Sequence, residues 1–140
     1  MTELPKSRVS IAQAIVDAAV SEAKKRSTRI CVAVVDTGGH LVAFLRMDGI
    51  PFHLIGVAQD KASTAASFGM TTTELAFGLN RQSKSAAEFF RDQKHIVLLG
   101  GGVPLRLDGE LLGGVGVSGC SEAEDEACAL AAIKSCTASG

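Results

Sequence analysis

The sequence predicts an α/β (α+β) domain in which a five-stranded antiparallel sheet is flanked by helices. Two hairpin signals predict the antiparallel pairing: a turn by composition at residues 36–39 and the pair Asp108-Gly109, each lying between two β-prone runs. Apolar residues at helical spacing before, between and after the hairpins predict the helices. The 140 residues, 46% hydrophobic and 21% charged, fit one globular domain covering residues 1–140.

The first half of the chain is expected to fold as helix, hairpin and helix. Ser10 and Gln13 have the spacing of a capping box and open an amphipathic first helix. Residues 30–35 and 41–45 are β-prone and form the two strands of the first hairpin. Residues 52–68 carry small apolar side chains on one helical face, so this second helix can lie close to whatever it covers.

The second half is expected to add helical turns, three strands and a last helix. Residues 71–93 have helical character, and Thr71 and Glu74 at their start have capping-box spacing. Three strands are expected at residues 95–99, 105–107 and 111–117, with a glycine-rich corner at 100–104. Ser121 and Glu124 then cap the last helix.

Composition excludes several functional classes. The formal net charge of -1, with acids and bases mixed along the chain, provides no basic face for a nucleic-acid partner. The polar first ten residues lack the apolar core of a signal peptide, and no stretch approaches the roughly 18 apolar residues of a membrane span. We therefore expect a cytoplasmic protein without a membrane partner, whose four cysteines are reduced packing thiols.

One motif resembles a nucleotide site and is rejected. Gly114-x-Gly116-x-x-Gly119 matches the dinucleotide fingerprint, but its glycines lie partly inside a predicted strand and the chain ends one helix later. We expect these glycines to allow close packing of a helix on the sheet. Gly100, Gly101 and Gly102 lack the Lys-Ser/Thr pair of a P-loop, and we expect a bend where backbone N–H groups approach a ligand or a neighbouring segment.

Charged residues gather where the second strand meets the next helix. Arg46 and Asp48 lie at the end of that strand, and Lys61 and Thr64 share one face of the helix. This arrangement indicates a ligand site. The alternative is a structural ion pair, Arg46–Asp48 or Asp48–Lys61, that fixes the loop.

Three histidines are candidates for acid–base or ligand chemistry. His53 begins the helix after a proline-containing loop, where it could act as an acid, a base or an iron ligand, although a solvated histidine is the alternative. His40 follows a turn and His95 begins a predicted strand, so both have structural explanations.

Five blocks in register resemble the GlcG/HbpS-like family, which includes the C-terminal domain of PduO. They are Val34-Val35-Asp36-x-Gly38-Gly39-His40-Leu41-Val42-Ala43, Arg46-Met47-Asp48-Gly49, Lys61-Ala62-x-Thr64-Ala65, Gly100-Gly101-Gly102-x-Pro104 and Gly114-x-Gly116-Val117-Ser118-Gly119. The resemblance implies a profilin-like fold with a five-stranded antiparallel sheet, and subunits that assemble into oligomers.

Two functions follow from the resemblance, and family membership does not choose between them. The first is binding of heme or a related tetrapyrrole, with His53 or another histidine as the iron ligand and Arg46 or Lys61 pairing with a propionate. The second is a cofactor-free lyase or isomerase acting by proton transfer on a small aromatic (hydroxylamino-aromatic) or hydroxy acid. There Arg46 or Lys61 holds the carboxylate, and His53 or Asp48 moves protons.

We therefore expect one cavity for the small-molecule ligand. His53, Lys61 and Asp48 are the candidate catalytic groups, and further ligand-binding positions are Arg46, Phe52, Thr64, Gly101 and Gly102. Alanine-rich helix faces and the adjacent Phe89 and Phe90 suggest more apolar surface than one sheet covers, so we also expect a homo-oligomer.

Overall fold

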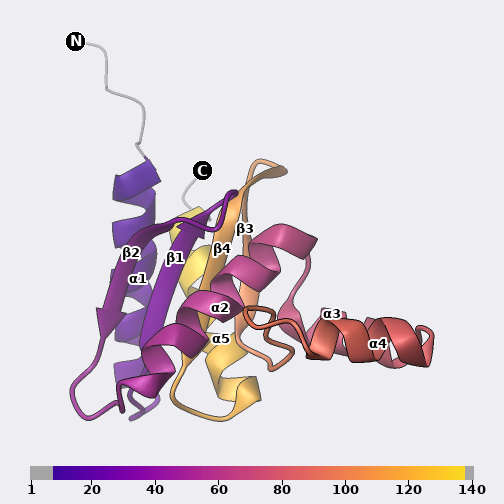
Figure 1. Cartoon of the computed structure of the whole chain (residues 1–140). Coiled ribbons are helices and arrows are strands. Elements are labelled where there is room, and N and C mark those ends of the chain that lie inside the picture. The colour runs from indigo at the N-terminus through magenta and orange to yellow at the C-terminus, as the bar shows by residue number, and fades with distance from the viewer. Residues whose placement is uncertain (1–7, 138–140) are drawn as a thin grey trace.

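The computed structural model describes residues 8–137, and an antiparallel sheet lies at its centre (Figure 1). The sheet has four strands in the order β2-β1-β4-β3. The strands are β1 (Cys31–Asp36), β2 (Leu41–Arg46), β3 (Gly102–Leu107) and β4 (Glu110–Ser118). Both predicted hairpins are present, because β1 pairs with β2 and β3 pairs with β4, each antiparallel.

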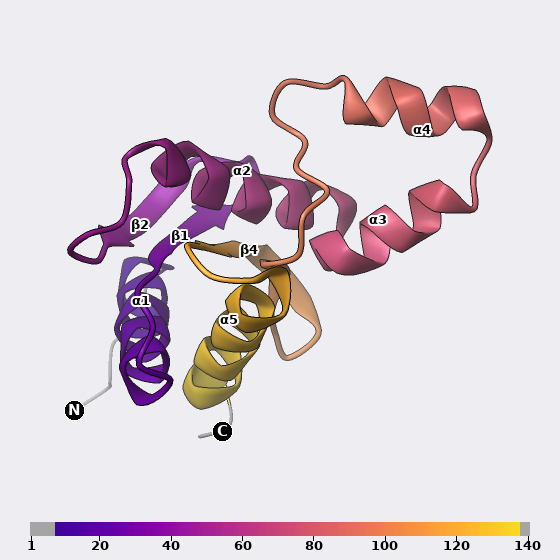
Figure 2. The same ribbon diagram turned by 90° about the horizontal axis from the view of Figure 1, so that it is seen from below.

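Helices cover both faces of the sheet (Figures 1 and 2). Helices α1 (Arg8–Lys25) and α5 (Glu122–Thr137) lie side by side on one face, and α2 (His53–Phe68) lies on the other. The central strand β1 is therefore buried on both sides: Val32 and Val34 belong to the core below α1 and α5, and Ala33 belongs to the core below α2. This explains why its sequence is an apolar run rather than an alternation.

Helix α2 lies unusually close to β4 because two strand positions are glycine. A Cβ atom at Gly114 would collide with the carbonyl oxygen of Ala62, and one at Gly116 would collide with that of Ala58. The close packing expected of the glycine motif is present, and it leaves no space for a nucleotide at these positions.

Helices α3 (Thr72–Asn80) and α4 (Lys84–Arg91) form a hairpin, the arm, that projects from the body of the molecule (Figure 2). The predicted capping box of Thr71 and Glu74 is present at the start of α3. The arm has a small core of its own, in which Leu75, Leu79 and Ala87 are buried.

The expected fifth strand is absent: within residues 8–137 the sheet has four strands, and residues 95–99 form no part of it. Threonine side chains, rather than a neighbouring strand, bind this backbone. The Thr64 hydroxyl donates to the His95 carbonyl at 3.3 Å and accepts from the Val97 N–H at 3.1 Å. The Thr72 hydroxyl donates to the Leu99 carbonyl at 2.7 Å. The apolar run is thus a connection between the arm and β3.

Two element boundaries also differ from expectation. Helix α1 already includes Arg8, so Ser10 lies inside the helix instead of capping it. Strand β3 begins at Gly102 and takes in much of the expected glycine-rich corner. No helix in the described part of the chain is long and apolar enough to cross a membrane.

Candidate functional site

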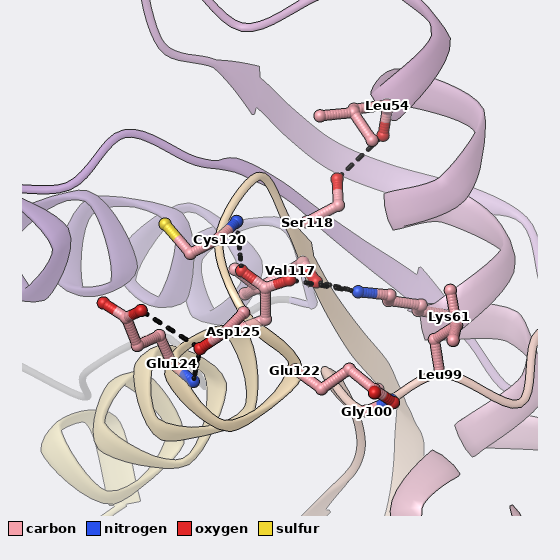
Figure 3. Close-up of polar contacts among 12 residues, drawn as sticks. Leu54, Lys61, Leu99, Gly100, Val117, Ser118, Cys120, Glu122, Glu124 and Asp125 are labelled. Carbon is pink, nitrogen blue, oxygen red and sulfur yellow. Dashed lines mark hydrogen bonds and ion pairs between the residues drawn. The ribbon is translucent and has the colours of Figure 1, made fainter.

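A buried ion pair joins helix α2 to helix α5 (Figure 3). Lys61 and Asp125 are 3% and 2% exposed, and the Lys61 Nζ atom lies 3.2 Å from Asp125 Oδ2. Lys61 Nζ also donates to the carbonyl oxygen of Val117, near the end of β4, at 2.9 Å. The lysine therefore ties three elements together, and its partner is Asp125 rather than the expected Asp48.

The other carboxylate oxygen of Asp125 fixes the turn before α5. It accepts a hydrogen bond from the Cys120 N–H at 3.0 Å. Burial raises the pKa of the Asp125 carboxyl above its ordinary value, while the Lys61 ammonium and the Cys120 N–H oppose that shift by stabilising the charged form. A buried charge on either side chain thus depends on the other.

The glycine corner packs against this pair and is bound by the protein itself. The Gly100 N–H donates to Glu122 Oε1 at 2.7 Å, and the Gly102 N–H donates to Thr72 Oγ1 at 3.0 Å. Gly101 has a φ of +127°, and a Cβ there would lie 2.9 Å from Lys61 Nζ. Of the two readings of the corner, approach to a neighbouring segment is the one these contacts show.

Arg46, Asp48, Phe52 and His53 lie at the other end of α2, at the end of β2 and in the loop that leads from β2 into α2. Arg46 Nη1 donates to the Ile50 carbonyl at 2.9 Å, and Arg29 Nη1 donates to the carbonyl of Asp48 at 3.3 Å. Phe52 is the N-cap residue of α2 and is 83% exposed, and His53 beside it is also exposed.

The expectation that Arg46, Asp48, His53, Lys61 and Thr64 converge on one cavity is wrong. Helical rise places position 61 about 12 Å along α2 from position 53. Lys61 is buried against β4 and α5, and Thr64 holds the segment that contains His95. The predicted residues form a buried structural group and a separate exposed loop group.

An open groove of about 450 Å³ lies at the C-terminal half of α2. Its walls come from α2, the turn between β1 and β2, the last residues of α4 and the segment after the arm. Three of its side chains are apolar and four carry hydroxyl groups. The lining residues are Thr37, Gly38, Gly39, Ser63, Thr64, Ser67, Phe68, Phe90, His95 and Ile96.

His95 is the ionisable residue in the lining of this groove, and a carboxylate on α2 lies beside it. The His95 Nδ1 atom is 3.3 Å from Asp60 Oδ1 and 3.4 Å from Asp60 Oδ2. In the tautomer that carries its proton on Nδ1, this proton is donated to Asp60 and the Nε2 lone pair is left for a ligand. Phe68 and Phe90 meet edge to face in the same lining, with ring centroids 5.6 Å apart. The groove thus combines an imidazole, two aromatic rings and hydroxyl groups.

Comparison with known proteins agrees with this fold. The family model described as haem-degrading protein HbpS-like matches residues 8–134. The chain belongs to the HbpS-like family. Among curated relatives, protein GlcG of Escherichia coli strain K12 is 38% identical to this HbpS-like chain over 108 residues, which are 77% of this chain and 78% of GlcG.

Two solved structures show how far the likeness of this HbpS-like protein extends. A double mutant of Streptomyces reticuli HbpS is 32% identical, with a TM-score of 0.82 over 96% of this chain and 90% of that one. The structure described as a PduOC:heme complex is 30% identical, with a TM-score of 0.81 over 93% of this chain and 94% of that one.

Sequence reasoning missed Asp125 and Asp60 in this HbpS-like chain. Asp125 shares one helical face with the buried residues Cys128, Ala129 and Ala132, and a carboxylate on such a face signals a buried partner. Asp60 carries no comparable signal, because its relation to His95 depends on how the arm returns to the body.

Proposed function

We propose that this protein binds heme or a related tetrapyrrole in the groove at the C-terminal half of α2. The observation that carries the proposal is His95, an imidazole in the groove lining whose Nδ1 faces the Asp60 carboxylate. A histidine held by a carboxylate is oriented for ligation through its other nitrogen. The similarity to the PduOC:heme complex and to HbpS supports the choice of ligand.

The groove residues fit the chemistry of such a group. Phe68, Phe90 and Ile96 offer apolar contacts to the face or edge of a flat aromatic ring system. The hydroxyl group of Ser67 can donate a hydrogen bond to a peripheral carboxylate, whereas the Ser63 hydroxyl already donates to the Asp60 carbonyl at 3.2 Å. Bound heme would supply an iron centre, and His95 would be its ligand from this chain.

This proposal moves the ligand set away from the residues expected first. Lys61 is engaged by Asp125 and Val117, so it is not available for a propionate without breaking a buried pair. Arg46 bonds to the loop at the opposite end of α2. His53 is exposed there and remains the competing iron ligand, to be separated from His95 by experiment.

A hemin titration tests the proposal. We expect the Soret band to shift on binding to the wild type, and Ser67→Trp, which fills the groove, to weaken binding about tenfold or more. Ser21→Trp is the matched control, because Ser21 is exposed on α1, away from the arm, and does not line the groove. Equal affinities for the three proteins, or no spectral change with the wild type, would contradict the proposal.

A small aromatic or hydroxy acid is the second candidate ligand. The hydroxyl groups of Thr37 and Ser67 in the groove favour it, because they can bind a carboxylate while the phenylalanines contact a ring. In that case proton transfer would be assigned to His95, since Lys61 is buried in its ion pair. Displacement of hemin by benzoate would show that both ligands use the groove, and binding of benzoate without competition would exclude a shared site.

A further inference from the structure

The arm leaves part of its apolar surface without cover in the single chain. In α4 only Ala87 is buried among the described residues, and Phe89 on the same helix is 59% exposed. Figure 2 shows α4 far from α1 and α5, and it meets the body through Phe90, whose ring packs edge to face on Phe68 of α2. A projecting helix with an exposed phenylalanine is typical of a surface that contacts another molecule.

A cleft of about 380 Å³ lies between α3 and α5. Phe77 in its wall is 64% exposed, and Ala76 and Ala123 add small apolar side chains. Glu122 and Glu126 are the charged residues in its lining, so the cleft combines an aromatic ring with an acidic edge.

The outer part of the arm has the opposite charge. Residues 81–94 contain four basic side chains (Arg81, Lys84, Arg91 and Lys94) and two acidic ones (Glu88 and Asp92). This segment therefore has a formal net charge of +2, whereas the whole chain has a formal net charge of -1. An exposed phenylalanine within a basic segment therefore complements an exposed phenylalanine within an acidic cleft.

We propose that α4 of one copy lies in the α3–α5 cleft of a second copy, with Phe89 against Phe77 and basic arm residues near Glu126. A two-fold arrangement makes the contact reciprocal, so each copy provides one arm and one cleft. Phe90, which follows Phe89, lines the proposed ligand groove, so this contact would also fix one wall of that groove. The proposal itself does not depend on which ligand the groove binds.

Light scattering at micromolar concentration tests the contact. We expect the wild type to have a mass that is a multiple of the 14.4 kDa chain, and Phe89→Asp to shift it toward the single chain. Val9→Asp is the control, because Val9 is 64% exposed on α1 and belongs to neither the arm nor the cleft, so its replacement should leave the mass unchanged. A wild-type mass of 14.4 kDa, or an unchanged mass for Phe89→Asp, would overturn the proposal.

Charge reversal provides a second measurement that does not alter the arm's apolar residues. Glu126→Lys should weaken association about tenfold, and Lys84→Glu in the same chain should restore part of it. Far-UV circular dichroism confirms that each variant is folded. If Glu126→Lys associates like the wild type, or if the second change weakens association further, the assigned pairing of arm and cleft is wrong.

Discussion

Lys61 Nζ and Asp125 Oδ2 lie 3.2 Å apart in the interior, where they join α2 to α5 beside the end of β4 (Figure 3). Two opposite charges at such depth are stable only together, because each has lost its hydration. The pair therefore fixes the positions of α2 and α5 relative to each other across the sheet.

Lys61→Met should destabilise the protein by about 3–5 kcal/mol, because it leaves the Asp125 carboxylate buried without a counter-charge. Asp125→Asn in the same chain removes that charge and keeps an acceptor for the Cys120 N–H, so the double variant should regain much of the loss. Urea unfolding of both single variants and the double variant measures the coupling. Additive losses would show that the two side chains do not interact.

The loss of unfolding free energy caused by Lys61→Met should become smaller as the pH falls. Burial raises the pKa of Asp125, and removing the lysine takes away the largest interaction that opposes this shift. A carboxyl whose pKa is higher in the folded than in the unfolded state binds its proton more tightly when folded, so falling pH stabilises the native state relative to the unfolded one.

Unfolding free energies at about pH 8 and about pH 5 check this sign. The difference between wild type and Lys61→Met should be smaller at the lower pH, within a window that begins above the ordinary aspartate pKa of 3.8. A difference that stays constant or grows at the lower pH would mean that Asp125 is not the uncompensated group.

A pair of glycine substitutions tests the close packing of α2 on β4. Gly116→Ala places a Cβ against the carbonyl of Ala58 and should destabilise the protein by about 1–3 kcal/mol through overpacking. Gly56→Ala is the control, because a Cβ there meets open space and alanine is better than glycine in a helix by about 1 kcal/mol. The midpoint of thermal unfolding should therefore fall for Gly116→Ala and rise for Gly56→Ala. A lower midpoint for both variants would contradict the packing.

Locally determined features are the ones that the sequence predicts well. The Asp108-Gly109 turn is present with φ values of +52° and +82°, because this dipeptide tolerates the left-handed conformation that a tight hairpin needs. The capping box of Thr71 and Glu74 forms between residues three positions apart. At the start of α5, the Ser121 hydroxyl accepts a hydrogen bond from the Glu124 N–H. In each case the interacting groups are neighbours in sequence.

The features that could not be predicted depend on contacts between distant residues. The run 95–99 has the composition of a strand, but the Thr64 and Thr72 hydroxyls bind its backbone at a distance of about thirty positions along the chain. The sequence pattern points to Lys61, but its partner Asp125, 64 positions away, follows from the packing of α2 on β4 and α5. The sequence predicts a strand at His95, and only the fold places this residue beside Asp60.

The two hydrogen bonds between the Thr64 hydroxyl and the backbone of His95 and Val97 can be tested by substitution. Thr64→Val keeps the side-chain shape but removes both hydrogen bonds to the segment, which should cost about 1–3 kcal/mol because Thr64 is 2% exposed. Hydrogen exchange at the Val97 amide should accelerate relative to amides in β1. Ser67→Ala, which removes an exposed hydroxyl from the same groove, should leave that exchange rate unchanged. Unaltered exchange at Val97 in Thr64→Val would exclude the threonine as its anchor.

The central claim is that His95, and not His53, is the residue through which this chain would ligate iron. The most direct measurement is the Soret spectrum and hemin affinity of the wild type, His95→Ala and His53→Ala under the same conditions. We predict that His95→Ala loses the wild-type spectrum and binds hemin about tenfold or more weakly, whereas His53→Ala retains both. A His95→Ala protein with the wild-type spectrum and affinity, or a His53→Ala protein without them, would contradict the account.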